Sequence, residues 1–183
     1  MSTGPDTPTD HHHASRSGAK TEDTVAEVIK ALGWDFAKKK AEVEALGVPY
    51  EGNIRIPKPA IFQQIHEGWG FETDGYMRSP EGREFIIEIK SHNAKLANGK
   101  PNGTAQEKVF YDLEKLRRGA YSNSPRLIYL FTGAMAHDVN EWSAFASIVE
   151  EENLPADVIF DNSANLSSLC HFLLSNERHE DSK

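Results

Sequence analysis

Residues 83–92 read REFIIEIKSH, a short apolar stretch in which a glutamate and a lysine stand two residues apart. Residues two apart in a β-strand point to the same face of the sheet, so Glu88 and Lys90 project together. Ile87 and Ile89 then point to the opposite face. Charges are costly on a strand with apolar neighbours on both sides unless they serve a purpose. We therefore take Glu88 and Lys90 as candidate site residues.

The segment upstream predicts an antiparallel neighbour for this strand. Residues 69–77, WGFETDGYM, are strand-like, and residues 78–83, RSPEGR, carry turn residues. A hairpin folded there brings Asp74 across from the region of Glu88. Two carboxylates at the ends of neighbouring strands repel each other unless a cation lies between them. Hard oxygen ligands of this kind suit Mg²⁺, with waters completing its shell, and we expect Mn²⁺ to substitute.

The lysine adds a catalytic group to this pair of carboxylates. Carboxylates nearby favour the charged form of Lys90, whose ammonium can then contact a phosphate or orient an attacking water. Metal, carboxylates and lysine together supply what phosphodiester hydrolysis requires: a nucleophilic water, charge neutralisation and positioning. The pattern thus predicts Asp74 and Glu88 as metal ligands and Lys90 as a catalytic residue. A Glu-X-Lys motif alone is common in solvated hairpins, so the prediction depends on its apolar neighbours and on Asp74.

Hydrophobic periodicity along the rest of the chain predicts an α/β fold, with a mixed central β-sheet flanked by helices on both faces. The strands expected beside the hairpin are residues 126–133 and 156–161. The helices expected are residues 20–33, 35–46, 104–121, 138–152 and 165–175. We expect a single domain over residues 19–176, a flexible polar N-terminal tail over residues 1–18, and a short polar C-terminal tail over residues 177–183.

Composition narrows the classes of partner. No apolar run among the 183 residues approaches the roughly 20 needed to span a bilayer, so no membrane partner is expected. The lone cysteine, Cys170, excludes a disulfide within the chain and fits a cytoplasmic setting. No phosphate-cradling GxxxxGK[ST] motif appears, so no nucleotide cofactor is expected. The net charge is −8, yet residues 78–126 hold ten Lys and Arg against six Asp and Glu, which leaves a localised DNA contact open.

The motif TDG at residues 73–75, followed by IIEIK at residues 86–90, resembles the core signature of the PD-(D/E)XK nuclease superfamily, which includes type II restriction endonucleases. The proline usual before the aspartate is Thr73 here. The resemblance covers roughly residues 18–132. It implies a restriction endonuclease-like core and a Mg²⁺-dependent DNA endonuclease.

The resemblance also implies further site residues. The first helix of the superfamily often contributes a glutamate to the metal site, and Glu22 stands at the matching point. Glu27 is the competitor, lying roughly 140° around the helix from Glu22. Residues 102–116 are similar to a segment of some restriction-type nucleases in which a helix begins beside the active site. Gln106 and Lys108 occupy its polar positions, where a helix N-terminus attracts phosphate, so we expect them to bind substrate.

The sequence also leaves open the oligomeric state and several other functions. Cutting both strands of a duplex needs two such sites, so a homodimer is expected. A Holliday-junction resolvase or a homing-type endonuclease would share the same core. A different class is a non-catalytic DNA-binding or assembly module that keeps the nuclease fold, and a nuclease acting on RNA is a third possibility.

Overall fold

The computed structural model describes residues 11–38, 40–47, 55–56, 71–91, 103–119, 121, 125–137 and 139–176. Helices within these ranges are α1 (His11–Ala31), α2 (Lys40–Ala45), α4 (Gly103–Arg117), α5 (Ala134–His137), α6 (Val139–Glu151) and α7 (Ser167–Asn176). Strands are β1 (Asp35–Ala37), β2 (Arg55–Ile56), β3 (Phe71–Glu72), β4 (Gly75–Arg78), β5 (Glu84–Lys90), β6 (Arg126–Thr132) and β7 (Ala156–Asp161). None of the helices in this part of the chain is both long and apolar enough to cross a membrane.

The main sheet has five strands in the order β1-β4-β5-β6-β7. Strand β4 pairs antiparallel with both β1 and β5, whereas β5, β6 and β7 run parallel. The predicted α/β fold with a mixed sheet is therefore confirmed. Strands β2 and β3 form a separate antiparallel pair.

Strands β4 and β5 form the predicted hairpin. Gly75 pairs with Ile87, and the five residues between the strands, 79–83, make the turn. The amide of Ser79 donates to the carbonyl of Arg83 at 2.8 Å, closing the turn. Gly82 adopts a φ of 88°, a left-handed conformation that glycine reaches without strain.

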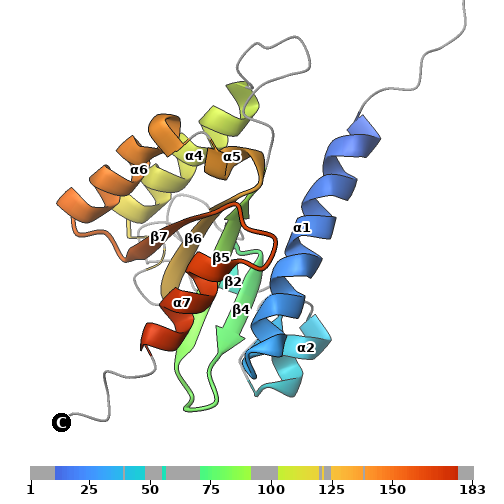
Figure 1. Cartoon of the computed structure of the whole chain (residues 1–183). Coiled ribbons are helices and arrows are strands. Elements are labelled where there is room, and N and C mark those ends of the chain that lie inside the picture. Colours follow the sequence, from blue (N-terminus) through green and yellow to red (C-terminus); the bar gives the residue numbers. More distant parts are fainter. Residues whose placement is uncertain are drawn as a thin grey trace, which may run out of the picture.

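Helices cover both faces of the sheet (Figure 1). Apolar side chains of β5 and β6 alternate between two cores, as strand geometry requires. On one face, Tyr129 and Phe131 pack with residues of α4, α5 and α6. On the other face, Ile87 and Ile89 pack with residues of α1 and α7. Strands β5 and β6 are thus covered by helices on both faces of the sheet.

Helix α1 ends as its sequence predicts but begins earlier. The amides of Gly33 and Trp34 donate to the carbonyls of Lys30 and Ile29, the bonding pattern of a Schellman motif closed by a glycine at φ 85°. The helix starts at His11, so residues 11–18, predicted as part of a flexible tail, are helical. Residues 1–10 and the predicted C-terminal tail lie outside the described residues.

The prediction of one helix over residues 35–46 is wrong at its beginning. Residues 35–37 form β1, which pairs with β4, and helix α2 starts only at Lys40. Phe36 and Ala37 are buried on opposite faces of the sheet, one in each core. Tertiary pairing and burial therefore override the helical appearance of this polar segment.

The tight contact between β1 and β4 requires Gly75. A Cβ added to this glycine would lie 2.4 Å from Cζ of Phe36 and 3.1 Å from Cγ2 of Ile87. Gly75→Ala should therefore overpack the core and lower the free energy of unfolding by about 1–3 kcal/mol, measured by urea denaturation. The double variant Gly75→Ala/Phe36→Leu should be destabilised by less than the sum of the two single changes. Full stability of Gly75→Ala would contradict this packing.

Candidate functional site

Glu88 and Lys90 project from β5 onto the face of the sheet that α4 covers, as their spacing predicts. Glu88 is only 5% exposed, and the side chain of Lys90 is 12% exposed. The ammonium Nζ of Lys90 lies 3.1 Å from Oε2 of Glu88. Both charges are therefore largely removed from water, where an unpaired charge is very unfavourable.

A third buried charge, Asp112 of α4, completes the environment of Lys90. Its Oδ2 lies 2.9 Å from Nζ of Lys90 and accepts a hydrogen bond from the Tyr129 hydroxyl at 2.8 Å. Its Oδ1 forms an ion pair with Lys115, one turn further along the helix. The Tyr129 ring centroid lies 5.4 Å from Nζ of Lys90, within range of a cation–π contact. Lys90 is thus bound by carboxylates from both the sheet and the helix.

Asp112 is not among the predicted site residues, although the sequence contains a signal for it. Val109, Leu113 and Leu116 form the buried stripe of α4. Asp112 lies three residues after Val109 and four before Leu116, so it falls within that stripe. A charge at a core position of an amphipathic helix requires a buried partner. Its partner, Lys90, lies in a distant part of the sequence, so the pairing becomes visible only in the fold.

Asp74 lies directly before β4 and is bound to β5. Its Oδ2 accepts a hydrogen bond from the amide of Ile89 at 2.6 Å, and its own amide donates to the carbonyl of Ile87 at 3.0 Å. The carboxylate is therefore attached to the residue between Glu88 and Lys90. The hairpin brings together the three residues that its sequence predicts for one site: Asp74, Glu88 and Lys90.

The pKa values of Asp74 and Glu88 are both raised, mainly because the two carboxyl groups are buried. The pKa of Glu88 is raised to about 7, chiefly by burial and also by the carboxylates of Asp74 and Asp112, although Lys90 and Lys115 favour the charged form. Burial also raises the pKa of Asp74, despite the Ile89 amide and Lys90, which favour its charged form. Both groups would gain from a further cation.

Lys90 and Asp112, by contrast, stay ionised. Burial alone would lower the pKa of Lys90, but the charges of Glu88 and Asp112 outweigh burial and raise it. Burial alone would raise the pKa of Asp112, but Lys90 and Lys115 outweigh burial and lower it. The structure thus holds a stable ion pair beside two carboxyl groups that are incompletely compensated.

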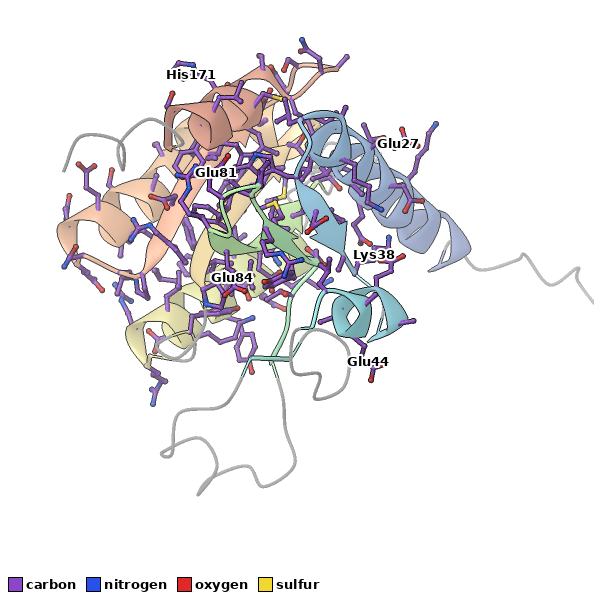
Figure 2. The ribbon with its side chains drawn as sticks, turned by 90° about the horizontal axis from the view of Figure 1, so that it is seen from below. Glu27, Lys38, Glu44, Glu81, Glu84 and His171 are labelled. Atoms are coloured by element: carbon purple, nitrogen blue, oxygen red, sulfur yellow. The ribbon has the colours of Figure 1, made fainter. Side chains whose placement is uncertain are left out.

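Glu22 of α1 is partly buried, whereas Glu27 of the same helix is exposed. Oε2 of Glu22 lies 3.0 Å from Nζ of Lys38, which also pairs with Asp23. The charge of Glu22 contributes to the raised pKa of Asp74. Glu27 is on the exposed side of α1, whereas Lys38 lies between α1 and α2 (Figure 2). Of the two competing residues, Glu22 is the one coupled to the site.

The predicted substrate-binding residues lie at the start of α4. Gln106 is in the first turn of this helix, and its side chain lies outside the described part of the structure. Lys108 is exposed to solvent. The helix therefore presents Lys108 at its surface while it buries Asp112 one turn further on.

The three carboxylates predicted as metal ligands do not form a ready chelating group. Among the described residues, no cluster of three or more His, Cys, Asp or Glu side chains is arranged to hold a metal ion. Glu22 is paired with Lys38, and Glu88 with Lys90. Mg²⁺, however, commonly binds through one or two carboxylates together with waters and substrate phosphates. Asp74 and Glu88 fit that smaller donor set, because both are carboxylates of the hairpin whose charged form is disfavoured by burial without a further cation.

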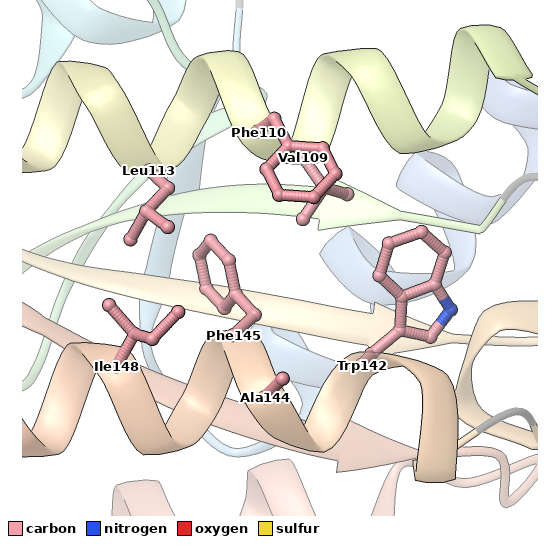
Figure 3. Close-up of a pocket in the computed structure, with 7 residues that line it drawn as sticks. All are labelled: Val109, Phe110, Leu113, Trp142, Ala144, Phe145 and Ile148. Carbon is pink, nitrogen blue, oxygen red and sulfur yellow. The ribbon is translucent and has the colours of Figure 1, made fainter.

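An apolar pocket of about 500 Å³ lies between α4 and α6 (Figure 3). The residues lining it are Val109, Phe110, Leu113, Trp142, Ala144, Phe145 and Ile148. None of them carries a charge or belongs to the predicted site. The pocket therefore does not explain why Glu88, Lys90 and Asp112 are buried.

Comparisons of the chain with protein-family models, curated proteins and solved structures find no match. The interpretation of the site accordingly depends on the chemistry and geometry of its own residues.

The raised pKa of Glu88 predicts how stability depends on pH. Since the value of about 7 in the folded protein exceeds the ordinary 4.5, the folded state binds more protons and loses stability as pH rises between these values. Glu88→Gln removes this contribution. Between pH 5 and pH 8, the free energy of urea unfolding should therefore fall less in Glu88→Gln than in wild type, by about 2 kcal/mol.

Glu81→Gln, which removes an exposed carboxylate in the hairpin turn, controls for general charge effects. An identical pH dependence in wild type and Glu88→Gln would show that Glu88 does not carry the buried, undercompensated charge.

Proposed function

We propose that this chain is a Mg²⁺-dependent DNA endonuclease with a restriction endonuclease-like core of the PD-(D/E)XK type. The observation that carries the proposal is the hydrogen bond from the Ile89 amide to Asp74, which fixes this carboxylate beside Glu88 and Lys90. A mixed sheet with a hairpin, a following helix and parallel strands is consistent with such a core. The resemblance of the motif itself adds independent support.

Each residue has a distinct role in the proposed hydrolysis. Asp74 and Glu88 would hold the Mg²⁺ ion, with Mn²⁺ able to substitute, and Glu22 of α1 would be its third ligand. The ion, when bound, activates a water and neutralises charge on the phosphate. Lys90 orients that water and contacts the phosphate with its ammonium. The water oxygen bonds to phosphorus as one phosphoester bond breaks, and the water protons are shared between the phosphate product, the freed hydroxyl and solvent.

The substrate requires contacts beyond the reacting phosphate. The N-terminus of α4 favours an anion, and exposed Lys108 adds positive charge there. Gln106 in the same turn is proposed to bind the DNA backbone with it. Cleavage of both strands of a duplex is proposed to involve a homodimer, since each chain carries one such set of residues.

A second candidate function is a non-catalytic DNA-binding or assembly module. The observation in its favour is that both Glu88 and Asp112 already pair with the Lys90 ammonium. In that case the buried charges serve only to hold α4 on the sheet. The two candidates differ in whether the protein hydrolyses DNA.

Plasmid cleavage distinguishes the proposed endonuclease from the non-catalytic module. Wild type should nick or linearise supercoiled plasmid with Mg²⁺ and stop in EDTA. Lys90→Ala should lower the cleavage rate by about 10²–10³-fold, because the developing charge on the phosphate loses its ammonium partner. Lys30→Ala, which removes an exposed lysine of α1, is the matched control and should cleave like wild type.

Thermal unfolding of each variant checks that it is folded. Absence of cleavage by wild type with any divalent ion would contradict the proposed enzyme, and retained DNA binding would then favour the module. Preference for RNA over duplex DNA in the same assay would reassign the substrate.

The proposed role of Glu22 is tested by metal affinity. Glu22→Gln should weaken Mg²⁺ binding about 10-fold in isothermal titration calorimetry, since it removes a charge that acts on the metal site. Glu27→Gln changes the same residue type on the exposed side of the same helix and should bind like wild type. Equal affinities for the two variants would remove Glu22 from the site.

A further inference from the structure

Asp112 is the least expected charge in the site, because nothing in the proposed hydrolysis requires it as a ligand or base. It is 4% exposed and stands in the apolar stripe of α4. Burying a carboxylate there costs free energy that a leucine would not. Its presence therefore points to a task that an apolar side chain cannot perform.

The contacts of Asp112 fix it from three directions. Lys90 and the Tyr129 hydroxyl bind Oδ2 at 2.9 and 2.8 Å, and Lys115 pairs with Oδ1. These partners come from β5, β6 and α4 itself. Both oxygens of the carboxylate are therefore engaged by partners within the protein.

Glu88 holds Lys90 in a different way. Its contact with the ammonium uses Oε2, and the proposed function requires the same carboxylate to bind a divalent ion. A carboxylate shared between a metal and an ammonium holds each of them less firmly. Lys90 therefore needs a second anionic partner that does not change when the metal arrives.

We propose that Asp112 is a positioning residue, which holds the Lys90 ammonium at the reacting phosphate while Glu88 is engaged with the metal. This inference rests on the proposed function, and it assigns the buried pair between α4 and β5 a role in the reaction. Tyr129 and Lys115 support it by fixing the orientation of the Asp112 carboxylate. Asp112 itself touches neither metal nor substrate.

Kinetics of Asp112→Asn tests the proposal. This change keeps the size of the side chain and an oxygen for the Tyr129 hydroxyl, but removes the charge. We expect kcat for DNA cleavage to fall about 10- to 100-fold while KM for DNA stays near wild type. Asp157→Asn is the matched control, since Asp157 pairs with Arg126 away from the site and its loss should leave kcat unchanged.

Nuclear magnetic resonance of lysine ammonium groups gives a readout independent of cleavage. The buried Lys90 ammonium should give a slowly exchanging signal, assigned by its absence in Lys90→Met. The signal should be lost or strongly broadened in Asp112→Asn and retained in Asp157→Asn. An unchanged signal and an unchanged kcat in Asp112→Asn would overturn the proposal.

Different results would contradict the proposed nuclease function and the proposed role of Asp112. If wild type cleaves no DNA, the proposed function fails, whereas the ammonium signals still test whether Asp112 holds Lys90. If Asp112→Asn folds but is too unstable for kinetics, the coupling between Asp112 and Lys90 is measured through stability instead. Asp112→Asn should lower the unfolding temperature less in a Lys90→Met background than in wild type, because the Lys90 ammonium that would lose its partner is then absent. Equal effects in both backgrounds would contradict the pairing.

Discussion

The ion pair between Lys90 and Asp112, buried where α4 packs on the sheet, is the interaction on which the site depends. Removing each charge from water costs several kcal/mol, so such a pair persists only when its geometry and hydrogen bonds are satisfied. Asp112 meets this condition through Lys90, Tyr129 and Lys115. Counting Asp74 and Glu88 as well, three carboxylates face two ammonium groups, which leaves one negative charge in excess. That excess is the basis for the cation site that we propose at the hairpin.

The two faces of strand β5 carry different residues: one face is apolar and packs in a core, and the other carries the charges of the site. Ile87 and Ile89 face the core shared with α1 and α7, so they contribute apolar burial. Glu88 and Lys90 face α4, where their charges are held. Since the two sets alternate along one strand, the apolar face fixes the register that brings the charged face to Asp74 and Asp112. Core packing on one side of the sheet thus determines the distances between charges on the other.

Local patterns predicted the hairpin, the two-sided sheet and the proximity of Asp74 to Glu88, because each follows from strand periodicity and a short turn. The helix expected over residues 35–46 begins instead as strand β1, since pairing with β4 and burial in two cores are not visible in that segment alone. Asp112 escaped prediction because its partner Lys90 is adjacent only in the fold. The choice between Glu22 and Glu27 was left open by the sequence, and the coupling of Glu22 to Asp74 favours the former.

A crystal structure with Mn²⁺, located by its anomalous scattering, tests the central claim most directly. We expect one ion per chain, within about 2.2 Å of oxygens from both Asp74 and Glu88, with the Lys90 ammonium still held by Asp112. Crystals grown in Mn²⁺ that show no anomalous peak at this hairpin, or one bound only elsewhere on the protein, would contradict the account.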